Sequence, residues 1–250
     1  MKSKRVLIVD DNDLNRKLFE NLIGQLFSFE SAKNGLEAVT LAKKGYFDLI
    51  LMDIQMPLMD GISAMKKIRQ DGSSTCPILA VTAYAEESDR TSFLEQGFDD
   101  FITKPIRPKE FLQLIQEYLK GQMRNFQNSE EPHYENSILD RKILAQLLKY
   151  NSKPSIQKVF QDFLLECHDT ESLIDEYESI IESSELIKKI HTLKGNSGTL
   201  GAMGIFQSAL KAEEYGRNEK NQEFDLEIKK LKNEIRQFRN FLNQEPIFDA

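Results

Sequence analysis

The sequence is poor in cysteine, histidine and tryptophan. Of its 250 residues, two are Cys, three are His and none is Trp. Cys76 and Cys167 are too far apart for a metal-binding or redox CxxC motif, and one pair cannot build a disulfide framework. We therefore expect two buried free thiols in a reducing compartment.

Long hydrophobic runs are missing as well. No apolar stretch approaches the roughly 20 residues that span a bilayer, and the basic N-terminus leads into only four apolar residues before Asp10. We therefore expect a cytoplasmic protein with no signal peptide and no membrane insertion. Because Met1 lies close to the first apolar run, we expect an independent protein and not the tail of a longer kinase.

An excess of positive charge is absent too. The chain has 33 Lys and Arg against 40 Asp and Glu, a net charge of −7, and neither half is basic. A domain that binds a polyanion needs a basic surface, so we expect no nucleic-acid partner. The length is comfortable for two domains.

The first 120 residues alternate short apolar runs with amphipathic stretches. Strands are predicted at Val6–Val9, Phe27–Ser31 (the weakest), Leu49–Met52, Ile78–Val81 and Phe101–Thr103. Helices are predicted at Asp13–Leu26, Leu36–Lys44, Ile62–Arg69, Glu86–Gln96 and Pro108–Leu119. Apolar runs without alternation indicate strands covered on both faces, so we expect a doubly wound, flavodoxin-like (βα)5 domain with a parallel sheet.

The remaining part of the chain shows helical periodicity and no strand signal. One helix is predicted from its cap Asp140 to about Leu148, and a second from Pro154 to about Glu182. A third helix is capped by Ser183 or Ser184, carries Ile187–Leu200 and is broken by Gly201 and Gly204. The last two are predicted at Ile205–Tyr215 and Phe224–Leu242. An inward stripe is formed by Leu186, Ile190, Leu193, Ser197 and Leu200. We expect a four-helix bundle over residues 137–250, a polar linker over 124–136 and the α/β domain over 1–123.

Polar residues end four of the five predicted strands. They are Asp10-Asp11, Asp53, Thr82 and Lys104-Pro105. The carboxyl ends of parallel strands meet at one edge of the sheet, so these side chains are expected to converge there. Three carboxylates this close repel one another, which implies a hard cation, and oxygen ligands suit Mg²⁺. A carboxylate can also be the nucleophile that forms an aspartyl phosphate, with Thr82 and Lys104 holding the phosphoryl oxygens.

The first half resembles a response-regulator receiver domain through the motifs VLIVDDNDLNR, LILMDIQMPLMDG, AVTA and FITKP. The resemblance implies that Asp53 is the phosphoacceptor and that Asp10, Asp11, Asp53 and the carbonyl of Gln55 hold Mg²⁺. It also implies that Thr82 and Lys104 sense the phosphoryl group and that the Lys104–Pro105 peptide is cis. Phe101 occupies the aromatic switch position, where it lacks the hydroxyl of the common Tyr.

One of the three histidines has distinctive surroundings. His191 lies in IHTLKGNSGTLGA, next to the inward residue Ile190, whereas His133 and His168 read as solvated or partly packed side chains. Lys194 and the two glycines that follow it suggest a basic group beside a surface that something approaches closely.

Residues 138–245 resemble a histidine-containing phosphotransfer (HPt) domain through His-x-Leu-Lys-Gly and the small residues after it. The resemblance implies that His191 carries a phosphoryl group, supported by Lys194 and Gln207.

The two halves together predict a phosphorelay protein, in which a phosphoryl group moves between phosphohistidine, Asp53 and His191. The implied partners are a sensor histidine kinase or another phosphohistidine donor, and a further receiver domain. No ATP-binding motif is visible, so we expect a signalling protein and not an enzyme, apart from slow self-dephosphorylation.

Two other functions share part of this pattern. In a phosphorylation-gated binding switch, the helical domain is an interaction or inhibitory module and His191 never carries phosphate. A Mg²⁺-dependent phosphohydrolase is disfavoured, because such enzymes commonly place a D-x-D nucleophile after the first strand, whereas Asp53 follows the third and Gln55 stands at its +2 position.

Overall fold

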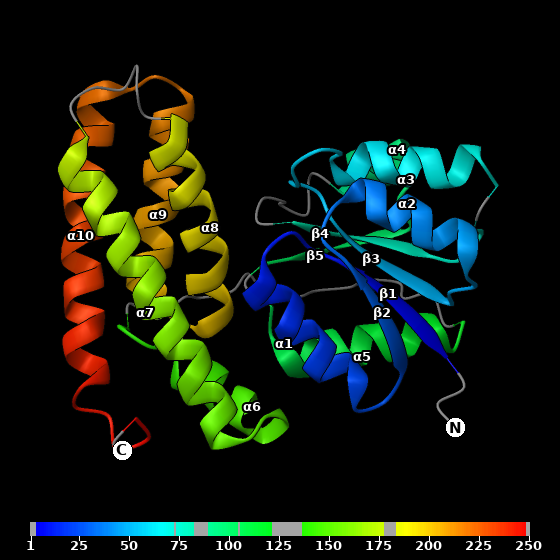
Figure 1. Cartoon of the computed structure of the whole chain (residues 1–250), viewed down its shortest axis with the longest axis horizontal. Helices are drawn as coiled ribbons and strands as arrows, with labels where there is room; N and C mark the ends of the chain where they lie inside the picture. The colour runs from blue at the N-terminus through cyan, green and yellow to red at the C-terminus, as the bar shows by residue number, and fades with distance from the viewer. Residues whose placement is uncertain are drawn as a thin grey trace. The chain divides into compact units, whose positions relative to one another are not determined.

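The computed structural model divides the chain into two compact units, Met1–Ser129 and Glu130–Ala250 (Figure 1). It describes residues 4–72, 74–82, 90–104, 106–121, 137–177 and 184–248. The predicted linker, 124–136, lies outside these ranges, and the predicted domain boundaries stay a prediction.

The first unit contains a five-stranded parallel sheet in the order β2-β1-β3-β4-β5. The strands are β1 (Arg5–Val9), β2 (Ser28–Ala32), β3 (Leu49–Asp53), β4 (Ile78–Thr82) and β5 (Asp100–Thr103). Every residue of β3 and β4 is buried, as the unbroken apolar runs predicted, whereas the edge strand β2 is partly exposed. The order reverses between β1 and β3, which places a crevice at the carboxyl ends of these two strands.

Helices cover both faces of this sheet (Figure 1). One face carries α1 (Asp13–Gly24) and α5 (Pro108–Leu119), and the other carries α2 (Gly35–Lys44), α3 (Gly61–Gln70) and α4 (Arg90–Gln96). Phe19 of α1 stacks on Phe111 of α5 with ring centroids 5.3 Å apart. The predicted (βα)5 architecture is therefore confirmed, although residues 86–89 of the predicted fourth helix lie outside the described ranges.

The second unit is an all-helical bundle. Its helices are α6 (Arg141–Tyr150), α7 (Lys153–Glu176), α8 (Ser184–Leu200), α9 (Met203–Arg217) and α10 (Asn221–Leu242). All five residues of the predicted inward stripe on α8 are buried. Asp140 caps α6 by accepting from the backbone N–H groups of Lys142 and Ile143. The four long helices and their apolar stripes match the predicted bundle.

Two predicted helix boundaries are wrong. The long helix ends at Glu176 and not near Glu182, because Tyr177 is extended. Gly204 does not break a helix but lies in the first turn of α9, where a Cβ would stand 2.3 Å from Oε2 of Glu234 on α10. Gly204 thus lies against the carboxylate end of the Glu234 side chain, while Gly201, with φ +79°, ends α8.

Among the described residues, no helix combines the length and the apolar character needed to cross a bilayer.

Candidate functional site

Three aspartates meet at the carboxyl edge of the sheet. Asp10 follows β1, Asp11 is the next residue, and Asp53 ends β3 on the neighbouring strand. Each offers a carboxylate oxygen that lies within 4.8 Å of the others. Asp10 and Asp53 are almost fully buried, at 0% and 6% exposure, and Asp11 is exposed. The side chains predicted from the strand ends therefore do converge, with two of the carboxylates buried and one exposed.

Lys104 joins the two buried carboxylates. Its Nζ donates to Oδ2 of Asp53 at 2.6 Å and to Oδ2 of Asp10 at 3.0 Å. Burial raises the pKa of Asp10 to about 7, against the attraction of Lys104 and with added repulsion from Asp53. Burial opposes the charge of Lys104, but the two carboxylates together raise the pKa of that ammonium. One ammonium among three close carboxylates leaves a hard-oxygen donor set with excess negative charge, which fits Mg²⁺.

Backbone contacts fix Asp10 in place. Its Oδ1 accepts from the backbone N–H of Asn12 at 2.9 Å, and its carbonyl accepts from Nη1 of Arg16 at 2.9 Å. Asn12 also caps α1. Arg16 is buried, so this cation of α1 fixes the backbone of Asp10, the residue that follows β1. Arg16 ends the motif VLIVDDNDLNR, but no role was predicted for it.

The turn after β3 fixes Asp53 in the same way. The backbone N–H of Gln55 lies 3.4 Å from Oδ1 of Asp53, and the N–H of Gly61 donates to the carbonyl of Ile54 at 2.9 Å. A Cβ on Gly61 would stand 2.0 Å from the carbonyl oxygen of Asp53. Only glycine allows α3 to begin this close to the aspartate.

The remaining receiver residues singled out from the sequence lie on the two neighbouring strands. Thr82 is buried at the end of β4, and its carbonyl accepts from the N–H of Lys104 at 2.7 Å. Phe101 of β5 is half-buried, and its ring stacks on Phe93 of α4 with centroids 5.6 Å apart. Pro105 lies outside the described residues, so the predicted cis peptide stays a prediction.

The second site is built around His191 on α8. Its Nδ1 lies 2.8 Å from Oε1 of Glu213 on α9, and the His191 side chain is 26% exposed. Burial opposes the charge of Glu213, but contacts with His191 and Lys194 outweigh it and lower the pKa of Glu213 to about 2. An ionised carboxylate only accepts hydrogen bonds, so Nδ1 donates to Glu213 and Nε2 is the ring nitrogen that Glu213 does not engage.

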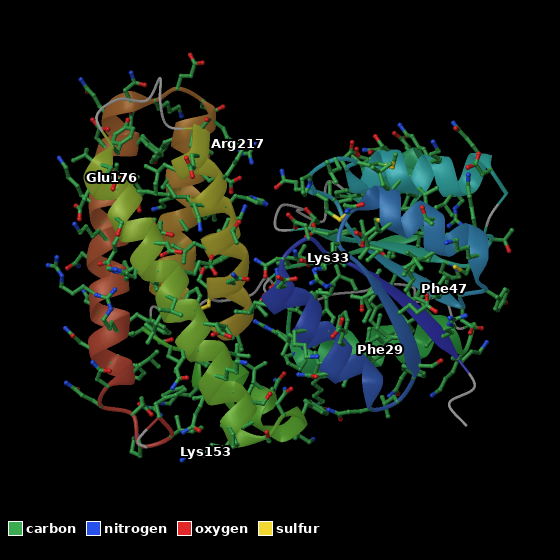
Figure 2. The ribbon with its side chains drawn as sticks, in the orientation of Figure 1. Phe29, Lys33, Phe47, Lys153, Glu176 and Arg217 are labelled. Atoms are coloured by element: carbon green, nitrogen blue, oxygen red, sulfur yellow. The ribbon has the colours of Figure 1, made fainter. Side chains whose placement is uncertain are left out.

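Glu213 binds two further cations. Nζ of the fully buried Lys194 donates to its Oε2 at 2.6 Å, and Nε of Arg217 donates to its Oε1 at 2.8 Å. The Lys194 charge is thus neutralised inside the bundle. Arg217, the last residue of α9 (Figure 2), is half-exposed and shares an oxygen atom with His191. It brings a positive charge close to the Nδ1 side of the histidine.

The glycines after Lys194 do not form the outer surface that the sequence suggested. Gly195 and Gly198 are buried, together with every residue from 193 to 200. Their small size therefore serves the packing of α8 inside the bundle. The acceptor beside His191 is Glu213, which lies six residues beyond Gln207 on the same helix. A sequence signal did exist, since Glu213 interrupts the buried stripe of Ala209, Ala212 and Gly216.

Comparisons with known proteins agree with the division of the chain. Residues 6–116 match the response regulator receiver domain family, and residues 158–241 match the Hpt domain family. The polar-differentiation response regulator DivK of Brucella anthropi is 41% identical over 119 residues, 46% of this chain and 96% of DivK. Hybrid signal transduction histidine kinase I of Dictyostelium discoideum is 39% identical over 124 residues, 46% of this chain but only 7% of the kinase.

Solved receiver structures resemble one unit of the chain. One is the receiver domain of sensor histidine kinase PA1611 from Pseudomonas aeruginosa PAO1, which has a magnesium ion coordinated in its active-site cleft. It is 32% identical to this chain, with a TM-score of 0.43, and the match covers 47% of this chain and 98% of that one. A chain of the Saccharomyces cerevisiae complex of Ypd1 with the Ssk1 receiver domain is 34% identical, with a TM-score of 0.44 over 49% and 94% of the two chains.

Proposed function

Since the chain belongs to the response-regulator receiver family and carries an Hpt domain after its receiver, we propose that Asp53 and His191 are the two phosphoryl carriers of a phosphorelay protein. The observation that supports this most is the buried Asp10–Lys104–Asp53 cluster, which presents a carboxylate next to a cation at an open sheet edge. The donor is a phosphohistidine on a partner such as a sensor histidine kinase, and a further receiver is the proposed recipient.

In the first step Asp53 acts as the nucleophile. A carboxylate oxygen forms a bond to phosphorus while the phosphorus–nitrogen bond of the donor breaks, and the donor nitrogen keeps the electron pair. Asp10, Asp11 and the carbonyl of Gln55 would hold Mg²⁺ beside Asp53, where the metal neutralises charge on the phosphoryl oxygens. Lys104 already contacts Asp53, so it is close enough to turn its ammonium toward a phosphoryl oxygen.

In the second step Nε2 of His191 forms a bond to the phosphorus of an aspartyl phosphate while the phosphorus–oxygen bond breaks and the carboxylate keeps the electron pair, or the same exchange runs in reverse. Glu213 keeps the proton on Nδ1, which leaves Nε2 as the nitrogen that bonds to phosphorus. Arg217, next to the ring, offsets the negative charge that arrives with the phosphoryl group. Lys194 acts through Glu213, since its ammonium is buried against that carboxylate.

Labelling with acetyl phosphate and Mg²⁺ tests both assignments. We compare the unmodified chain with Asp53→Asn and His191→Gln and sort the label by its stability, because acyl phosphates are lost in alkali and phosphohistidine is lost in acid. Alkali-labile label should disappear with Asp53→Asn, and acid-labile label should disappear with either variant. If the unmodified chain takes up no label, the role of Asp53 as phosphoacceptor is refuted. Label confined to Asp53 would favour the phosphorylation-gated switch or an external partner for His191.

A further inference from the structure

Arg16, near the start of α1, has a buried guanidinium group that donates a hydrogen bond from each terminal nitrogen. Its Nη1 donates to the backbone carbonyl of Asp10 at 2.9 Å, and its Nη2 donates to Oδ1 of Asp13. The Arg16 side chain is only 10% exposed, whereas that of Asp13 is 82% exposed. An ion pair with Asp13 alone could form at the surface, where such pairs contribute little to stability. The carbonyl of Asp10 is therefore the contact that holds this charged side chain below the surface.

The backbone of Asp10 is held at both ends. Asp10 comes directly after Val9, the last residue of β1 that pairs with both neighbouring strands. Its N–H donates to the carbonyl of Ala32 on β2 at 3.2 Å, and its carbonyl accepts from Arg16. The first contact joins two backbones and continues the sheet, whereas the second is made by a side chain. A substitution of Arg16 therefore removes one of the two contacts without touching the strands.

The carbonyl that Arg16 holds belongs to the peptide group between Asp10 and Asp11. A peptide group is planar, so a fixed carbonyl also fixes the direction in which the chain continues to Asp11. The carboxylate oxygens of Asp10, Asp11 and Asp53 lie within 4.8 Å of one another. Asp10 is buried in this cluster and Asp11 is exposed, so the spacing of their two carboxylates depends on the peptide group that joins them.

The charge of Arg16 does not help the cluster to hold a metal ion. Nζ of Lys104 already contacts Asp10 and Asp53, and a further cation beside the cluster repels a divalent cation. The carboxylate of Asp13 offsets this charge only in part, because it faces solvent. Charge and geometry therefore predict opposite effects of removing the guanidinium: its charge opposes metal binding, and its hydrogen bond to the backbone favours it.

We propose that Arg16 is a positioning residue for the Mg²⁺ site, which holds the peptide group between Asp10 and Asp11 so that both carboxylates are presented to the metal. The proposal rests on the proposed function, since that function places Mg²⁺ among these carboxylates. Residues that orient metal ligands through hydrogen bonds typically contribute about 10–100-fold to metal affinity. We expect this contribution to exceed the repulsion from a cation that is itself paired with a carboxylate.

Metal titrations of the full chain test the proposal. Arg16→Met removes the guanidinium and keeps an unbranched apolar stem, and Arg16→Lys keeps the charge but replaces the planar fork with one flexible donor. The matched control is Lys17→Met, because Lys17 is the next residue of α1 and forms an exposed ion pair with Glu20 at the same i, i+3 spacing as the pair of Arg16 with Asp13.

Three measurements are made on each variant. Binding of Mn²⁺ is followed by electron paramagnetic resonance of the free ion, and binding of Mg²⁺ is measured by competition with Mn²⁺. Labelling by acetyl phosphate is measured over a series of Mg²⁺ concentrations. Thermal unfolding in EDTA shows whether each variant folds.

We expect Arg16→Met to weaken binding of both metals about tenfold or more, and to raise by the same factor the Mg²⁺ concentration that gives half-maximal labelling. The labelling rate at saturating Mg²⁺ should recover most of the parent value, because the phosphoacceptor Asp53 lies on another strand, β3. Arg16→Lys should bind metal at least about threefold more weakly than the parent. Lys17→Met should match the parent within about twofold.

The proposal fails if Arg16→Met binds metal as tightly as the parent or more tightly, which is the result that charge alone predicts. It also fails if Lys17→Met loses as much affinity, if the parent binds neither metal, or if labelling of Arg16→Met stays slow at saturating Mg²⁺, which would show a general disturbance of the site. If Arg16→Met does not fold, Arg16→Lys decides, and an affinity equal to that of the parent is the contrary result.

The proposed function can fail separately. A parent chain that binds metal but takes up no label refutes the role of Asp53 as phosphoacceptor, and the metal titrations still decide the role of Arg16.

Discussion

At the scale of single residues, Gly61 is the position in the receiver site where an added side chain is tolerated least. The space between α3 and Asp53 is filled by backbone, because an added Cβ would meet the Asp53 carbonyl oxygen at 2.0 Å. We expect Gly61→Ala to shift Asp53, to lower the free energy of unfolding by about 1–3 kcal/mol, and to slow labelling by acetyl phosphate at least tenfold.

The control for Gly61 is another glycine of the same domain. Gly72 has a φ of +62° and nothing within 4 Å of an added Cβ. Gly72→Ala should cost about 1 kcal/mol of stability through backbone strain and leave the labelling rate unchanged. Denaturant titrations and labelling time courses measure both effects. Equal labelling rates for the two variants would refute the role given to Gly61.

Glu213 yields a second prediction at this scale. Glu213→Gln removes the charge that neutralises the fully buried Lys194. Loss of one partner of a buried ion pair typically costs about 3–5 kcal/mol. We expect a loss of stability of this order in denaturant titrations, and slower labelling of His191 by phosphoramidate.

A double variant separates stability from chemistry. Lys194→Met added to Glu213→Gln removes the stranded ammonium, so most of the stability should return. The labelling rate of His191 should stay low, because the charge that holds the Nδ1 proton is still missing. If the rate recovers together with stability, Glu213 has only a structural role.

At the scale of elements, the α7–α8 interface contains a buried carboxyl group. Glu166 of α7 accepts from the side-chain amide of Asn196 on α8, while its Oε1 and Oδ1 of Asn196 have no hydrogen-bond partner. Burial raises the pKa of Glu166 to about 7, against the opposing effect of Asn196. The folded bundle therefore favours the protonated acid.

This raised pKa gives a pH dependence of known sign. The unfolded chain releases the proton near pH 4.5 and the folded chain near pH 7, so the free energy of unfolding should fall between these values, by about 1.4 kcal/mol per pKa unit. We expect Glu166→Gln to flatten this decline and to raise Tm at pH 8. Asp162→Asn, an exposed carboxyl on the same helix, is the control, and equal pH profiles for both variants and the parent would contradict the assignment.

Element types were predictable from the sequence, but some boundaries were not. Unbroken apolar runs predicted β3 and β4 because both strands are covered on two faces. Gly204 was wrongly predicted to break a helix because glycine has a low helix propensity, whereas it lies in the first turn of α9 beside Glu234 of α10. Such a contact joins residues on two different helices, α9 and α10, so no local pattern contains it.

The residues of the candidate sites also divide into those that the sequence predicted and those that it did not. Asp10, Asp53 and Lys104 stand at strand ends, and topology alone predicted that they would meet. Glu213 contacts His191 from another helix, so this contact depends on the relative rotation of α8 and α9. Sequence periodicity indicates which face is buried but does not fix that rotation.

At the scale of the whole molecule, the two units should respond differently to removal of divalent metal. The carboxylate cluster lies in the first unit, and His191 is surrounded by Glu213, Lys194 and Arg217 in the second. We expect EDTA to abolish labelling of Asp53 by acetyl phosphate and to leave labelling of His191 by phosphoramidate unchanged. The labelling of His191 is measured on the Asp53→Asn variant, so that label on Asp53 does not interfere. Loss of both labels with EDTA would contradict the separation of the sites.

The hydrogen bond between His191 and Glu213 has a consequence for the direction of signalling. With the proton already on Nδ1, the ring that loses its phosphoryl group from Nε2 is neutral imidazole, and no proton has to arrive from water. The rate of transfer should therefore differ little between water and heavy water. A step that neither takes up nor releases a proton has an equilibrium that does not shift with pH, so the relative stabilities of the two phosphoryl bonds and the concentrations of the phosphorylated partners set the net flux.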